Sequence, residues 1–136
     1  MTTAGMTAAG TFEVELAQQP TSSGEAMLGR MSIDKRFHGD LEATSKGEML
    51  SAATAIKNSA GYVAIECVRG SLHGKRGSFV LQHSGTMTRG QGLLNVTVVP
   101  DSGTDELAGL SGRMTIHIEN GQHFYELEYT LSLPEE

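Results

Sequence analysis

Apolar and polar residues alternate with a period of two along most of this chain. The alternation recurs between positions 11 and 133, and glycine or clusters of Pro, Ser and Asp separate one run from the next. A period of two places successive side chains on opposite faces of an extended strand, whereas an amphipathic helix needs a period of about 3.6. The pattern therefore predicts an all-β protein.

The alternating runs divide the chain into eight expected strands. The third run carries small or polar residues and is the weakest, and the segment 51–61 after it is expected to hold a short helix or a loop. The eight runs are 11–18, 27–37, 41–49, 62–71, 75–84, 92–99, 113–119 and 122–133.

Asn120-Gly121 predicts how the last two runs pair. Asn-Gly favours a type I′ turn, which needs two positive φ angles and closes a two-residue hairpin. Such a turn pairs Glu119 with Gln122 and places Ile116 opposite Tyr125 on an apolar face. The opposite face then carries the cross-strand pair Arg113 and Glu128.

His73-Gly74 predicts a second two-residue turn, with Leu72 opposite Lys75. In this register Glu66 lies opposite Leu81 and shares one face with His83 and Tyr62. Cys67 lies on the other face. A slip of one residue at Gly70 or Gly77 would reverse both assignments.

Eight strands without the helical segments of a parallel α/β fold indicate an antiparallel meander. A meander with open edges is prone to aggregation, and eight strands close into a barrel that is filled by side chains or holds one small ligand. The prediction is a single closed barrel over residues 11–133, preceded by a disordered segment over residues 1–10, and a β-sandwich is the alternative.

Four segments carry a resemblance to a known family: 39–50 (GDLEATSKGEML), 62–66 (YVAIE), 77–85 (GSFVLQHSG) and 98–112 (VVPDSGTDELAGLSG). They resemble a bacterial family catalogued as a domain of unknown function and grouped with allene oxide cyclase-like barrels. The resemblance implies an eight-stranded antiparallel barrel, an oligomer, and no assigned activity or cofactor. His73 and Asp105 depart from the family pattern, and both lie in expected turns.

The glycine-rich stretch 102–112 has neither the GxGxxG spacing nor the lysine of a phosphate-binding loop, and it precedes a strand instead of a helix. Its glycines are expected to allow bends at a barrel corner. Leu107 or Leu110 would then cover the barrel end.

Four residues are predicted to bind a ligand: Glu66, His83, Tyr62 and Tyr125. An inward carboxylate is costly unless it is paired, which makes Glu66 the strongest indication of a site. Glu66 and His83 are suitable as general acid and base if their face is the interior, although a structural role for His83 is the simpler interpretation. The tyrosines offer packing area and a hydroxyl.

Other features exclude functions. Ten Lys and Arg against sixteen Asp and Glu give a charge of −6, and without a basic run this argues against nucleic acid and anionic membranes as partners. The five histidines lack metal-binding spacing, so neither a metal nor a cofactor is expected. The lone Cys67 forms no internal disulfide and is expected to be inert. Nothing at the N-terminus resembles a signal peptide, so a cytoplasmic location is expected.

Three functions remain open from the sequence. The leading hypothesis is a barrel that binds a small apolar or amphipathic ligand through an open end. The second is an isomerase or cyclase acting on such a ligand. The third is a packed structural barrel that forms a homo-oligomer through outward apolar residues such as Val80, Val99 and Phe124.

Overall fold

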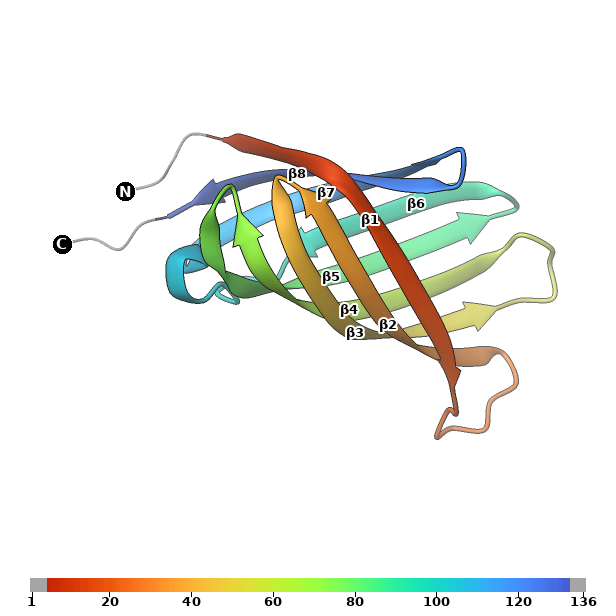
Figure 1. The fold of residues 1–136 in the computed structure, drawn as a ribbon. Coiled ribbons are helices and arrows are strands. Elements are labelled where there is room, and N and C mark those ends of the chain that lie inside the picture. The colour runs from red at the N-terminus through yellow and green to blue at the C-terminus, as the bar shows by residue number, and fades with distance from the viewer. Residues whose placement is uncertain (1–4, 133–136) are drawn as a thin grey trace.

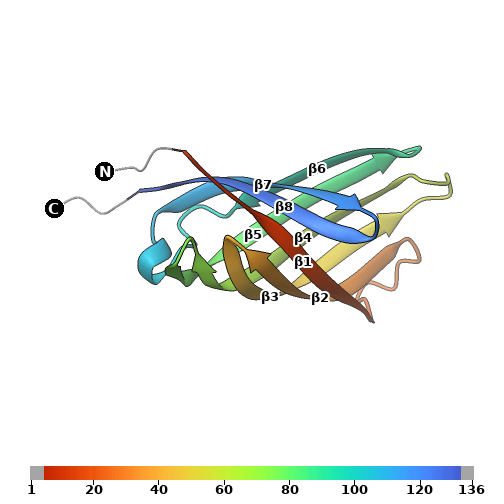
Figure 2. The ribbon, with the colours of Figure 1, turned by 45° about the horizontal axis from the view of Figure 1, so that its top comes forward.

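The computed structural model describes residues 5–132, which form one closed antiparallel barrel in which each strand pairs with its neighbour in sequence and β8 pairs with β1 (Figure 1). The predicted eight-stranded meander is confirmed, and the β-sandwich is excluded because the wall closes on itself (Figure 2). The elements are β1 (Met6–Gln19), β2 (Leu28–Gly39), β3 (Leu41–Ala53), β4 (Ala60–Leu72), β5 (Lys75–Thr88), β6 (Gln91–Val98), the short helix η1 (Asp105–Leu107), β7 (Leu110–Glu119) and β8 (Gln122–Leu131).

Both predicted hairpin registers are confirmed. Asn120 and Gly121 have φ angles of 52° and 78°, and the turn pairs Glu119 with Gln122. His73 and Gly74 have φ angles of 47° and 81°. That turn places β4 against β5 without a slip, and alternate side chains of both strands therefore point inward as expected.

The expectation of a disordered segment over residues 1–10 is wrong for residues 6–10. Met6–Gly10 is the first part of β1 and pairs with β8, where Ala8 lies opposite Leu127 and is fully buried. These backbone hydrogen bonds close the barrel, and they hold the segment in a strand although its apolar alternation is weak. Residues 1–4 and 133–136 lie outside the described residues.

The segment after the third run is a strand for longer than expected. β3 continues to Ala53, so the loop is confined to residues 54–59. Small residues form a strand here because β3 is hydrogen-bonded on both sides, with Ala52 opposite Leu28 of β2 and Gly61 of β4. Tertiary pairing thus outweighs local strand propensity.

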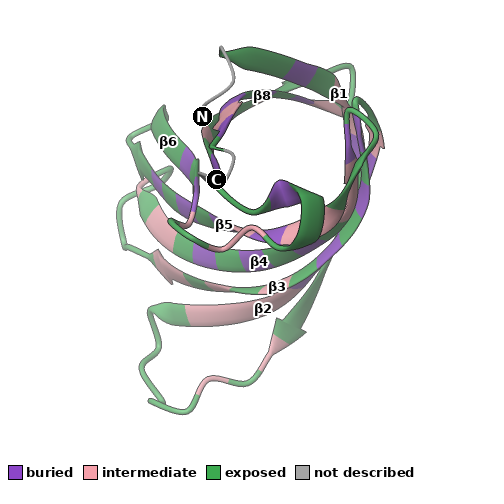
Figure 3. Cartoon of the chain, turned by 90° about the vertical axis from the view of Figure 1, so that its left-hand side faces the viewer, coloured by how far each residue is buried: buried purple, intermediate pink, exposed green. Residues whose placement is uncertain are grey.

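One end of the barrel is plugged. η1 lies across it, and Leu107 reaches into the interior, where it is 1% exposed (Figure 3). This confirms the prediction for Leu107. Gly77 leaves room for the segment around η1, because an added Cβ there would overlap the Thr104 carbonyl oxygen and lie 3.2 Å from the Leu107 side chain. Large apolar residues fill the same half, among them Phe12, Phe37, Leu41, Leu72, Phe79, Leu110 and Leu127.

The wall is least continuous between β6 and β7. These strands pair only at Val96 opposite Met114 and at Thr97 opposite Arg113. β6 is otherwise held by β5, and β7 by β8. On the side of the β5–β6 and β7–β8 turns, residues 91–95 of β6 and 115–119 of β7 therefore have no partner across this seam.

Candidate functional site

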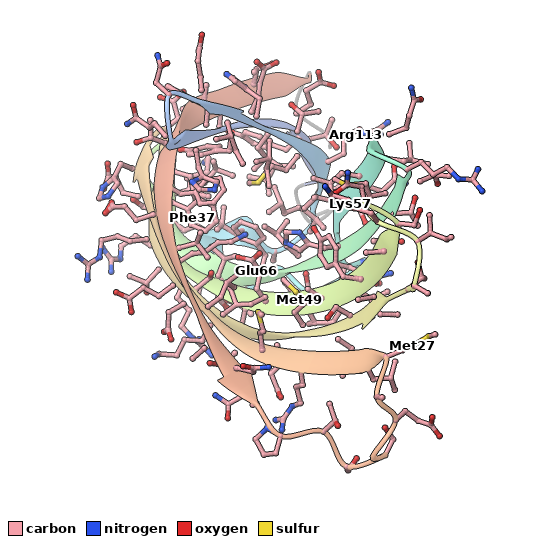
Figure 4. The ribbon with its side chains drawn as sticks, turned by 90° about the vertical axis from the view of Figure 1, so that its right-hand side faces the viewer. Met27, Phe37, Met49, Lys57, Glu66 and Arg113 are labelled. Atoms are coloured by element: carbon pink, nitrogen blue, oxygen red, sulfur yellow. The ribbon has the colours of Figure 1, made fainter. Side chains whose placement is uncertain are left out.

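A charged cluster lies inside the barrel at mid-height. Glu66 of β4 is 0% exposed and points into the interior (Figure 4). Its Oε1 accepts a hydrogen bond from Ser45 Oγ of β3 at 2.7 Å. Its Oε2 accepts from Lys35 Nζ of β2 at 2.7 Å and lies 2.5 Å from His83 Nε2 of β5. Four consecutive strands therefore supply one buried polar network.

The strand registers explain this convergence. Lys35 lies opposite Ser45, and His83 lies opposite Ala64, one inward position from Glu66. Gly47 lies opposite Glu66 and makes room for its side chain, since an added Cβ at Gly47 would be 2.8 Å from the Glu66 Cβ. The predicted turn register placed Glu66 and His83 on one face without deciding which face is the interior, and in the structure both side chains are buried inside the barrel.

Lys35 was not predicted as a site residue. Its side chain is 7% exposed, and its ammonium lies 4.9 Å from the centre of the Phe12 ring and 5.8 Å from that of Phe37. Both rings offer their negative π faces to the cation. The signal was present in the sequence, because Lys35 occupies the inward position between Ile33 and Phe37 in the alternating run.

The network holds Glu66 as a carboxylate. Burial raises the pKa of Glu66, but the hydrogen bond from His83, the charge and hydrogen bond of Lys35 and the hydrogen bond from Ser45 outweigh burial and lower it to about 2. Because this carboxylate only accepts, Nε2 of His83 carries the proton that it donates to Glu66. In a neutral imidazole, Nδ1 of His83 is then an acceptor.

Tyr62 stands beside the cluster on the side away from the plug. Its ring centre is 6.4 Å from that of His83, and the ring lies over Gly85, at which an added Cβ would be 2.5 Å from Tyr62 Cε1. Burial and the negative charge of Glu66 raise the pKa of the Tyr62 hydroxyl, which therefore keeps its proton at neutral pH.

The half of the barrel beyond Tyr62 is open to solvent. Side chains that the registers direct inward remain exposed there, including Leu94 at 41% and Ile118 at 65%. Figure 4, drawn from this end, shows Met49 on the same side of the wall as Glu66. The inward apolar side chains of this open half, exposed or partly exposed, are Leu16, Met31, Met49, Met87, Leu94, Ile116 and Ile118.

Tyr125, predicted as a ligand contact, belongs to the plugged end instead. Its hydroxyl accepts from the Leu41 backbone N–H at 2.9 Å and lies 3.0 Å from the His38 carbonyl oxygen. These contacts fasten the turn between β2 and β3. The residue is 2% exposed, and its hydroxyl is occupied by the backbone, so its role is structural.

Cys67, His117 and His123 lie on the faces that the predicted strand registers give. Cys67 is exposed on the outer face. His117 lies opposite Phe124 and His123 opposite Ile118, so these two histidines point to opposite faces. Within residues 5–132, no group of three or more His, Cys, Asp or Glu side chains is arranged to hold a metal ion. No helix in that range is long and apolar enough to cross a membrane.

An antiparallel eight-stranded barrel with one plugged end and one open end belongs to the class of small barrels whose interior is partly filled by side chains. Within that class, this chain belongs to the family described as protein of unknown function DUF3224, whose model matches residues 8–129. The family is thus one of unknown function, as the resemblance implied, while the link to allene oxide cyclase-like barrels is not established.

A solved structure agrees over nearly the whole chain. It is the crystal structure of a DUF3224 protein of unknown function from Shewanella oneidensis, with 53% sequence identity and a TM-score of 0.92. The match covers 96% of this chain and 100% of that one. A search of curated proteins found no match.

Proposed function

We propose that the open half of the barrel binds a small apolar or amphipathic molecule. Its apolar part contacts the open-half side chains, and its polar part reaches His83 and Tyr62. The observation that carries the proposal is the set of inward apolar side chains that no other part of the described chain covers.

The contrast between the two halves supports this function. Leu107 and large side chains fill the plugged half to near-complete burial, but the open half leaves Met87 at 44% and Leu16 at 49% exposure. Covering apolar surface stabilises by about 25 cal/mol per Å². A ligand that fills this space gains that free energy, and methionines suit variable ligands because their side chains adapt.

Neighbouring residues on β3 provide a matched test, because Met49 points into the barrel and Leu50 points outward at 52% exposure. The probe is Nile red, an uncharged apolar dye, whose fluorescence is titrated with protein. Met49→Arg is expected to weaken binding at least about tenfold, since one buried charge opposes apolar contact. Leu50→Arg should leave binding unchanged. Absence of dye binding, or equal effects of both variants, contradicts the proposal.

A second candidate is an isomerase or cyclase, which the contact between Glu66 and His83 favours. A carboxylate behind an imidazole orients it and stabilises its protonated form, as a general base requires. This candidate predicts that Glu66→Gln slows turnover of any compound the barrel converts, by roughly 100-fold or more. Unchanged turnover in that variant counts against it.

A further inference from the structure

A ligand in the open half would not meet a free charge of the cluster around Glu66. Lys35 Nζ donates to Glu66, and the rings of Phe12 and Phe37 flank it, so its ammonium is covered from several sides. Lys35 and Glu66 also cancel each other in formal charge. This pair therefore presents neither a free cation nor a free carboxylate to the open half.

His83 offers an unused nitrogen. Its Nε2 is engaged by Glu66, and no hydrogen bond among residues 5–132 uses Nδ1. None of the fully buried side-chain nitrogen or oxygen atoms in that range lacks a partner, so Nδ1 is not shut away from solvent. The proton on Nε2 makes Nδ1 of the neutral ring an acceptor of one hydrogen bond.

Tyr62 offers the complementary group. Its hydroxyl makes no hydrogen bond with the described residues, and its ring is 6.4 Å from the His83 ring. A phenolic O–H donates one hydrogen bond. The two side chains thus carry one unused acceptor and one unused donor at diagonal inward positions of β4 and β5.

We propose that the ligand's polar group is a neutral hydroxyl, which donates to Nδ1 of His83 and accepts from the hydroxyl of Tyr62. This inference rests on the proposed binding function and adds the chemical class: an aliphatic alcohol. A carboxylate cannot donate to Nδ1, so it leaves this acceptor unpaired. An ammonium group satisfies Nδ1 but leaves the Tyr62 donor unpaired and brings a charge into an apolar site.

Several strands place polar or charged side chains near His83. Glu66 and Tyr62 of β4 and Lys35 of β2 face it, with the Ser45 hydroxyl of β3 beyond Glu66. The inward row of β6 and β7 beside His83 is apolar, with Val96 and Met114. On β8, the ring of His123 packs against Phe12.

The test compares octanol, octanoate and octylamine, which share one chain length, as competitors of Nile red. Nitrogen-15 NMR of histidine-labelled protein first defines a pH at which His83 is neutral. At that pH, octanol is expected to compete at least about tenfold more strongly than either ion, because each ion leaves a partner unpaired.

Two tyrosine variants provide the matched control, since each loses only a hydroxyl. Tyr62→Phe should weaken octanol binding about two- to tenfold, the usual range for the loss of one hydrogen bond. Tyr125→Phe changes the hydroxyl at the plugged end and should leave the octanol affinity unchanged. Addition of octanol should also shift the Nδ1 resonance of His83, which a purely structural histidine would not show.

The outcomes separate this inference from the function on which it rests. If Nile red binds but octanoate equals or exceeds octanol while His83 is neutral, the hydroxyl assignment is overturned and the binding function stands. An unchanged octanol affinity in Tyr62→Phe also overturns the assignment. If Nile red does not bind at all, both proposals fail.

Discussion

At the scale of single residues, the most unusual feature is a charged carboxylate buried inside the barrel. Glu66 is fully buried, yet three donors from three other strands keep it ionised. Burying charges costs free energy that good geometry must offset. The network therefore links the pH of the solution to the stability of the barrel.

Glu66 is expected to add acid sensitivity. Its folded pKa of about 2 lies below the ordinary value of 4.5, so its contribution, about 3 kcal/mol, is present above pH ~5 and is lost as the pH falls toward ~2. The difference in unfolding free energy between the wild type and Glu66→Gln should shrink by about that amount over this range. Urea unfolding at several pH values measures it.

The control variant for this comparison is Glu15→Gln, at an exposed position of β1. Its difference from the wild type should stay within about 0.5 kcal/mol at every pH, as is usual for surface substitutions. A pH-independent difference for Glu66→Gln would contradict the assigned role of the network.

At the scale of secondary-structure elements, the strands are unequally supported. β4 is paired along its length on both sides, whereas β7 meets β6 at two positions only. The unpaired stretch of β7 lies toward Ile116 and Ile118, at the open half. The seam between β6 and β7 is thus the part of the wall that opens with the least loss of hydrogen bonds.

Amide hydrogen exchange is expected to reveal this seam. Amides of residues 115–119 that point away from β8 should exchange on the order of 100-fold faster than those of residues 64–68 in β4, since they lack a strand partner. NMR-detected exchange resolves the two groups. Equal protection of both would show that the wall is continuous in solution.

At the scale of the whole molecule, the outer wall carries apolar side chains as well. Leu50 of β3 and Val63 of β4 lie opposite each other and are more than half exposed, and Ile65 is 47% exposed nearby. Val80, Val99 and Phe124, the outward residues named from the sequence, are only partly exposed. The homo-oligomer, like the cytoplasmic location, stays a prediction from the sequence.

Light scattering tests the oligomer. Exposed apolar patches commonly mark contacts between chains, so the solution mass is expected to be a multiple of the chain mass. Val63→Lys should then reduce the mass toward that of a monomer, while Ser84→Lys, opposite Val63 on β5, should change it less. A monomeric wild type at high concentration contradicts the prediction.

The sequence was sufficient for the fold because its signals are local. Alternation marks the strands, and the turns at His73-Gly74 and Asn120-Gly121 define two registers through their positive φ angles. The extent of β1 was underestimated because its first residues are held by β8, more than a hundred positions away in sequence. Such a long-range pairing leaves little trace in local pattern.

The sequence by itself determined that the barrel is all-β and that Glu66 and His83 face the same way, because strand periodicity and turn geometry decide both. Only the tertiary structure decided that Lys35 and Ser45 complete the cluster, that Tyr125 holds the β2–β3 turn at the plugged end and that one half stays open. These facts depend on how distant strands meet around the barrel and on the volumes of their side chains, and neither is encoded within any single strand.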